Sequence, residues 1–239
     1  MDSSSTTNVI TILYDHIDFV IVNKPPHISV QNESGQQGIL PMLCQQWGLS
    51  KLWLVHRLDK VTSGILILTK NAQTAAIFGQ LFEHKQIEKY YLALSNKKPK
   101  KKQGSVKGGM KKIRDGKWIL DHSDINFAHT QFFSFSSTPG TRLFIVKPLT
   151  GKTHQIRVAL KSIGAPIIGD KLYTGSTADR TYLHAFCIRF MYRDELITIS
   201  CPAENGEHFT HPTISKLISH YHQPWLLNWP KSPNSKLIA

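Results

Sequence analysis

The segment His56–Lys70, HRLDKVTSGILILTK, joins a short polar loop to a run of aliphatic residues. Ile65–Leu68 is bounded by Gly64 and by Thr-Lys, which is the pattern of a buried strand. Asp59 lies in the loop that enters this strand, two residues after Arg57. Because rigid strands often position functional loops, we expect Asp59 to be a functional carboxylate. An isolated Arg-x-Asp pattern also fits a local surface ion pair, so the rest of the chain must decide.

The composition is that of a globular protein. Of the 239 residues, 41% are hydrophobic and 19% are charged, which allows a sizeable core. Residues 1–20 lack the basic region and long apolar run of a signal peptide, and no apolar run reaches the length of a membrane helix. Three widely separated cysteines fit buried thiols better than disulfides or a metal site. We therefore expect a soluble cytoplasmic protein that does not associate with membranes.

Positive charge is concentrated in one segment. The net charge is +13, and Lys97–Lys117 holds ten Lys or Arg residues against one acid. Its glycines and its proline predict a flexible basic loop over about 97–117. A dense block of one charge favours contact with a polyanion, although a solvated surface loop is the alternative. Lysine contacts to phosphate would give affinity without sequence preference.

The hydrophobic pattern mixes strands and helices. Predicted strands cover Ile10–Leu13, Phe19–Val22, Ile65–Leu68, Tyr90–Leu94, Phe132–Phe135, Leu143–Val146, Cys187–Met191 and Leu196–Ser200. Predicted helices cover Ile39–Trp47, Ala72–His84 after an Asn71 cap, His154–Ile163 up to Gly164, and a last helix capped by Thr213. The irregular order of these elements predicts an α+β fold around a largely antiparallel sheet. We find no internal repeat and no clear second core.

A second polar block begins the predicted helix at residue 154. Pro148–Arg157 reads PLTGKTHQIR, and Arg157 follows the apolar Ile156, so its guanidinium should emerge at the edge of the core. A purely structural arginine is the alternative at this position. The Gly-Lys-Thr within this block lacks the upstream glycine of a phosphate-binding P-loop, because position 146 is valine. His208 and His211 have no third ligand nearby, so we expect no metal.

Five sequence blocks occur in a fixed order: HRLDxxTSG, KxYxA, TGxTHQIR, GxPIxGDxxY and LHA. Together they resemble the RluA-type family of RNA pseudouridine synthases, from about Asn23 to about Phe190. The resemblance implies an extended, mixed, mostly antiparallel sheet flanked by helices, with an RNA-binding cleft across its middle. It implies one catalytic domain over 1–239, with a core over about 10–222 and a flexible tail over about 228–239. The short lead before Asn23 indicates a compact member without an N-terminal S4 module.

The resemblance also assigns a reaction and roles. Uracil would be detached through N1 and rejoined to the ribose through C5, without a cofactor. Asp59 would be the essential carboxylate, either attacking C1′ or removing the 2′ proton. Arg157 would pair with that carboxylate, and an opposite charge favours its ionised form. Tyr91 would stack on the base and is a candidate to remove its C5 proton, whereas Tyr90 should point to the opposite strand face.

The same resemblance implies a structured RNA partner, a ribosomal or transfer RNA stem-loop. Because the sequence has no coiled coil or other obvious dimer element, we expect a monomer. Arg57 would enter the RNA stack while the target nucleotide flips out. Other expected RNA-binding residues are Lys152, His154, Lys100, Lys101, Lys102 and Lys107. The chain departs from the family pattern at Lys152, Ala159 and His27, where arginine, histidine and glycine are usual. These departures concern the choice of substrate more than the chemistry.

Two other functions remain compatible with the sequence. A non-catalytic RNA-binding or chaperone protein on the same fold would bind RNA independently of Asp59. The complete set of Asp59, Tyr91 and Arg157 favours the enzyme. A DNA-binding protein could use the same basic segment, but no helix-turn-helix or zinc module is recognisable.

Overall fold

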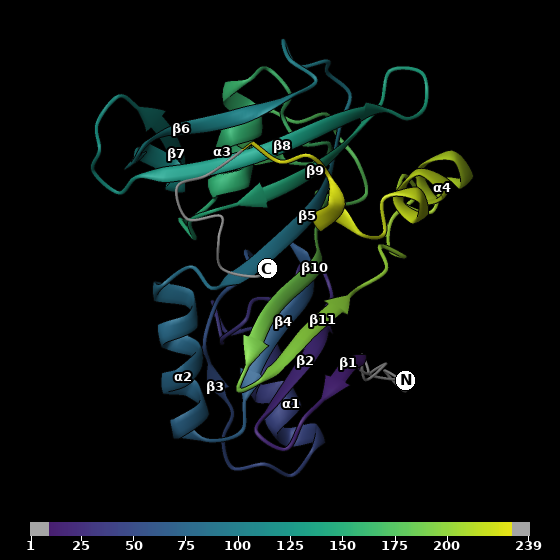
Figure 1. Cartoon of the computed structure of the whole chain (residues 1–239). Coiled ribbons are helices and arrows are strands. Elements are labelled where there is room, and N and C mark those ends of the chain that lie inside the picture. Colours follow the sequence, from purple (N-terminus) through teal and green to yellow (C-terminus); the bar gives the residue numbers. More distant parts are fainter. Residues whose placement is uncertain (1–9, 231–239) are drawn as a thin grey trace.

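The computed structural model describes residues 10–230, which form one long, mostly antiparallel sheet with helices around it (Figure 1). The strands are β1 (Ile12–Asp15), β2 (Phe19–Lys24), β3 (Trp53–Leu54), β4 (Ser63–Thr69), β5 (Ile87–Ser95), β6 (Gln103–Lys112), β7 (Trp118–Asp121), β8 (Ala128–Ser136), β9 (Arg142–Pro148), β10 (Leu183–Tyr192) and β11 (Glu195–Ser200). The helices are α1 (Ile39–Gln46), α2 (Ala72–Glu83), α3 (Gln155–Ser162) and α4 (Pro212–His220). The predicted fold class is confirmed.

The strand order is β1-β2-β4-β10-β5-β9-β8-β6-β7, with β11 paired to β10 and β3 paired to β4. The pairing of β4 with β10 is parallel, and it joins the first third of the chain to its last third. All seven residues of β4 are buried, as the aliphatic run predicts. The predicted hairpin of β8 and β9 also forms, and the Thr141 amide donates to the carbonyl of Thr138 in its turn.

The predicted helix ends are partly confirmed. The side chain of Asn71 caps α2 by accepting a hydrogen bond from the Thr74 amide at 2.8 Å. Gly164 follows α3 with a φ of +77°, a conformation that glycine adopts without strain. The prediction that Thr213 caps α4 is wrong. His211 is the cap, and its Nδ1 accepts from the Thr213 amide, because Pro212 occupies the first helical position.

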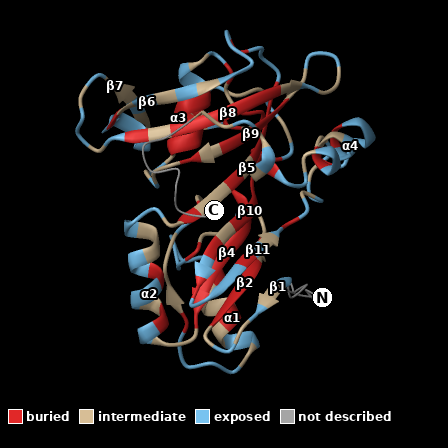
Figure 2. Ribbon diagram, in the orientation of Figure 1, coloured by how far each residue is buried: buried red, intermediate tan, exposed pale blue. Residues whose placement is uncertain are grey.

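Two large apolar clusters lie along the sheet, where the sequence indicated only one core (Figure 2). The first packs α1 and α2 against β1, β2 and β4, with Phe78 of α2 fully buried. The second packs α3 and α4 against β5, β8 and β9, with Leu160 of α3 fully buried. Tyr91 packs against both clusters, so it lies where the two halves of the molecule meet.

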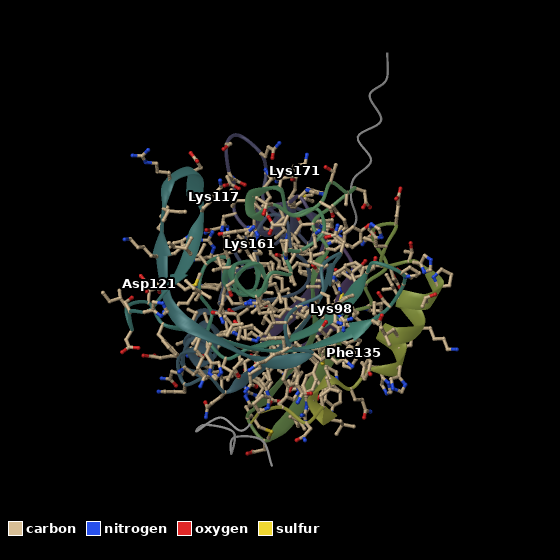
Figure 3. All side chains as sticks on the ribbon, turned by 90° about the horizontal axis from the view of Figure 1, so that it is seen from above. Lys98, Lys117, Asp121, Phe135, Lys161 and Lys171 are labelled. Carbon is tan, nitrogen blue, oxygen red and sulfur yellow. The ribbon has the colours of Figure 1, made fainter. Side chains whose placement is uncertain are left out.

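The prediction of a flexible basic loop over 97–117 is wrong for most of that segment. Strand β6 starts at Gln103 and pairs with β8 and then with β7. Its glycines allow close approach of backbones: a Cβ at Gly108 would lie 2.7 Å from the carbonyl oxygen of Asp121. Strands β6 and β7 form a hairpin. Figure 3 shows Lys117 and Asp121 on this hairpin, beside α3, the helix that carries Lys161. Glycine often indicates a loop, but Gly108 lies within a strand, at a place where two backbones approach closely.

The start of the expected tail packs against the sheet. Trp229 stands edge-on to Phe133 at 4.9 Å between ring centres, and its Nε1 donates to the carbonyl of Pro224. The side chain of Gln131 donates to the carbonyl of Pro230 at 2.8 Å. The rest of the expected tail, 231–239, lies outside the described residues. Within residues 10–230, no helix has the length and apolar character to cross a bilayer.

Candidate active site

The loop that carries Asp59 is fixed where β4 meets β10. Gly64 has a φ of +104°, and a Cβ there would lie 2.2 Å from the carbonyl oxygen of Ala185. The neighbouring Ser63 hydroxyl is 2.8 Å from Nδ1 of His184 and accepts a 2.6 Å hydrogen bond from Arg180. The TSG and LHA blocks are therefore direct neighbours, and only glycine fits their closest approach.

Lys24, at the end of β2, connects the loop that carries Asp59 to the loop that follows β2. Its ammonium is fully buried and donates to the carbonyl oxygens of Pro25, Ile28 and Lys60. Burial, with the charge of Arg180, lowers the pKa of Lys24 to about 7. Because Lys60 follows Asp59 directly, the buried ammonium holds the backbone beside the candidate catalytic carboxylate. Lys24 was not among the site residues predicted from sequence.

A cleft of about 840 Å³ crosses the middle of the molecule, between α2 and the turn that precedes α3. It brings together six of the residues predicted from sequence, which lie on three separate segments: Arg57, Asp59, Tyr91, Lys152, His154 and Arg157. Arg57 and Asp59 lie in the loop before β4, and Tyr91 lies on β5. The remaining three lie in the turn that precedes α3 or in α3 itself.

Arg157 connects two carboxylates. Its Nη1 donates to Oδ2 of Asp59 at 3.3 Å, and its Nε and Nη2 donate to Asp170 at 2.7 and 2.8 Å. The Asp59 side chain is 25% exposed, whereas those of Arg157 and Asp170 are 6% and 1% exposed. Burial acts to lower the pKa of Arg157, but the two carboxylates outweigh it and raise that pKa.

These contacts decide between the two interpretations of the Arg-x-Asp pattern. Within the described residues, Asp59 forms its ion pair with Arg157, 98 residues away, and Arg57 is exposed at the rim of the cleft. Asp170 was missed as a site residue. Asp170 belongs to the GxPIxGDxxY block, but this pattern does not indicate that the aspartate binds an arginine.

Tyr91 and Tyr90 face opposite sides of β5. Tyr91 lines the cleft, whereas Tyr90 is buried near Trp229 and Lys147. Burial, and then the charge of Asp59, raises the pKa of Tyr91 above its ordinary value. The phenol therefore meets a substrate in its neutral form. Its ring can stack on a base, but removal of a proton by its oxygen requires the phenol to lose its own proton first.

The start of α3 is held by polar side chains. His154 precedes the helix in a left-handed conformation, with a φ of +55°, and its Nδ1 lies 2.9 Å from the hydroxyl of Tyr173. The ring of Tyr173 lies under the Arg157 guanidinium, with 5.0 Å from Cζ to the ring centre. Burial, more than any nearby charge, lowers the pKa of His154. A lowered pKa favours the neutral imidazole. His154 is therefore more suited to form hydrogen bonds with a ligand than to supply a positive charge.

The predicted basic residues do not form one surface. Lys152 lines the cleft, and the exposed Lys107 lies opposite His129, which also lines it. Three other lysines precede β6, outside the lining of the cleft: Lys100, Lys101 and Lys102. Among residues 10–230, no group of three metal-ligating side chains is present.

Comparisons with known proteins agree with this geometry. A family model described as RNA pseudouridylate synthase matches residues 18–162. An "Uncharacterized RNA pseudouridine synthase" of Haemophilus influenzae is 50% identical over 214 residues, covering 89% of this chain and 96% of that protein. "Ribosomal large subunit pseudouridine synthase C" of Rickettsia bellii is 35% identical over 172 residues, 68% of this chain and 56% of that protein. The structure of Human RNA Pseudouridylate Synthase Domain Containing 1 has a similar fold, with a TM-score of 0.74 at 20% identity, covering 93% of this chain and 98% of that chain.

Proposed function

Because the chain belongs to the RNA pseudouridylate synthase family, we propose that it isomerises uridines of ribosomal or transfer RNA through the carboxylate of Asp59. The chain is an RNA pseudouridine synthase, an isomerase. The observation that carries the proposed mechanism is the placement of Asp59, Tyr91 and Arg157 around one cleft. These side chains come from three parts of the sequence, and the proposed chemistry uses all three.

The proposed reaction breaks the bond between C1′ and N1, and uracil leaves with the electron pair. Asp59 either attacks C1′ to form an ester or removes the 2′ proton to give a glycal. The uracil then turns and C5 bonds to C1′, which either displaces the Asp59 carboxylate from the ester or is accompanied by return of the proton to C2′ of the glycal. The C5 proton then leaves and N1 gains a proton. The product is an isomer of the substrate and no electrons are gained or lost, so we propose that no cofactor takes part.

The side chains around Asp59 support this role. Arg157 stabilises the ionised carboxylate but is itself held by Asp170, so Asp59 keeps freedom to turn toward a ribose. Tyr91 offers a neutral ring on which a flipped base can stack. Arg57, exposed at the rim, is placed to enter the stack that the base leaves. Flipping costs a few kcal/mol, and least for an unpaired base.

The proposed substrate is a structured RNA, bound by a monomer that acts in the cytoplasm as a single catalytic domain. The name of the relative from Rickettsia bellii favours ribosomal RNA as the first class to test. The three cysteines are free, as a reducing compartment allows. The excess of positive charge supplies sequence-independent affinity for any RNA, so the identity of the uridine must be found by experiment.

A pseudouridine map of cellular RNA from cells with and without this gene tests the proposal. We expect one or more sites in ribosomal or transfer RNA to disappear without the gene. Purified protein should restore the same sites when it is added to RNA from the cells that lack it. If no site is lost, and the purified protein modifies no RNA, the proposed function is wrong.

A further inference from the structure

Lys89 points into the cleft from β5, two residues before Tyr91. Alternate residues of a strand share a face, and both side chains line the cleft. The Lys89 ammonium lies 5.6 Å from the ring centre of Phe82, which belongs to α2. On the other side, a Cβ added to Gly151 would lie 3.9 Å from the same nitrogen. The ammonium therefore lies between α2 and the turn that precedes α3.

Two of the other cations that line the cleft are already paired with carboxylates, and Arg57 and Lys85 are exposed. Lys147 pairs with Glu88 at 2.6 Å, and Arg157 pairs with two carboxylates. Among the described residues, no acceptor lies within hydrogen-bonding distance of the Lys89 ammonium, and burial alone lowers the pKa of Lys89 to about 8. A half-buried ammonium without an acceptor is unfavourable in the free protein, and an anionic ligand would relieve that cost.

The position of Lys89 relative to Asp59 indicates which anion it meets. Among the described residues, Asp59 forms its ion pair with Arg157, and Lys89 forms none with a carboxylate. The Lys89 ammonium lies instead beside Phe82 and Gly151. If a base stacks on Tyr91 and its ribose faces Asp59, Lys89 is beside the nucleotide and away from C1′. The negative groups in that region of an RNA strand are its phosphodiesters.

We propose that Lys89 binds a phosphodiester next to the uridine that enters the cleft. The inference rests on the proposed function, since it is the RNA strand that brings the phosphate to this position. An ammonium donates strong charge-assisted hydrogen bonds to phosphate oxygens. Gly151, without a side chain, leaves room for that phosphate beside the lysine. The Lys89 contact would hold the flipped nucleotide by its backbone, whichever sequence surrounds it.

The test compares the binding of uridine 3′,5′-bisphosphate with that of uridine, measured by NMR titration of the full chain. The wild type should bind the bisphosphate about tenfold more tightly. Lys89→Met should lose most of this preference, while Lys89→Arg should retain it. Lys216→Met is the matched control, because it removes one exposed lysine charge from α4, away from the cleft. Thermal unfolding of each variant checks that it folds.

The dependence on pH gives a second readout. As the pH rises from about 7 to about 9.5, the Lys89 ammonium loses its proton, so the preference of the wild type should fall. Lys89→Arg should keep its preference over the same range, because arginine stays charged. The inference is wrong if the wild type binds neither nucleotide or both equally, or if Lys89→Met keeps the preference. Neither nucleotide needs to react, so a failed isomerisation assay would contradict the proposed function without changing this comparison.

Discussion

Arg157 reaches Asp59 through a single hydrogen bond of 3.3 Å between Nη1 and Oδ2. The same guanidinium holds Asp170 with two shorter bonds, so its position is set mainly by the buried carboxylate. Asp59 thus has a cation beside it without being locked by it. A carboxylate that must turn toward a substrate and carry charge requires this combination.

Asp170→Asn should destabilise the fold. The change removes one partner of a buried ion pair, which typically costs about 3–5 kcal/mol. Asparagine also accepts fewer hydrogen bonds from the guanidinium, so Arg157 should lose its fixed position and activity should fall. Urea unfolding of wild type and variant measures the change in the free energy of unfolding.

Asp15→Asn is the control for Asp170→Asn. Asp15 pairs with Lys70 on the surface and its side chain is 61% exposed, so its loss should cost less than about 1 kcal/mol. Equal costs for the two variants would show that the buried pair of Arg157 and Asp170 does not organise the site.

Gly64→Ala should prevent β4 from pairing normally with β10. Alanine at Gly64 would be strained by its φ of +104° and would clash with the backbone of Ala185. Gly140→Ala separates these effects, because Gly140 has a φ of +72° but no atom within 4 Å of an added Cβ. The control should lose about 1 kcal/mol from backbone strain, and Gly64→Ala should lose clearly more. Thermal unfolding midpoints that fall equally would contradict the clash.

Lys107 and Lys101 should differ in their contribution to RNA binding. Lys107 lies opposite His129 of the cleft, and its charge adds to burial in lowering the pKa of His129 to about 4. Lys107→Met should therefore reduce the slope of log affinity against log salt by about 0.7 to 0.9, the range for one phosphate contact with a single strand or a duplex. Lys101→Met should leave the slope unchanged, because Lys101 precedes β6 and is not paired with a residue that lines the cleft.

An unmodified transfer RNA transcript serves as the probe for both lysine variants. A larger change of slope for Lys101→Met than for Lys107→Met would contradict the expectation that the RNA passes Lys107. We use single substitutions and not a deletion of the basic segment. Deletion of residues 97–112 would remove β6 from between β7 and β8 and so disrupt the sheet.

Much of the fold followed from local patterns. The aliphatic run Ile65–Leu68 and the Asn71 cap predicted β4 and α2, because apolar periodicity and a capping side chain act over a few residues. The hairpin of β6 and β7 was missed for the same reason. Gly108 is required by its contact with Asp121, across the hairpin, and a local reading of glycine and lysine indicated a loop.

The site was predictable in part. The sequence blocks named Asp59, Tyr91 and Arg157, and the structure brings all three to one cleft. Lys24 and Asp170 were missed because each acts through another residue. The acceptors of Lys24 are backbone carbonyls, and the partner of Asp170 is an arginine 13 residues earlier. Neither partner can be identified from residue type and spacing alone.

Asp59→Asn removes the carboxylate to which the proposed reaction is assigned. Asparagine has nearly the same shape and can still accept a hydrogen bond from Arg157, so the variant should fold and bind RNA like the wild type. It cannot form the ester or remove a proton as a carboxylate does. The measurement is pseudouridine formed by the purified protein in RNA from cells that lack the gene. We expect none above background for Asp59→Asn, and formation at the wild-type rate would show that Asp59 is not the catalytic carboxylate.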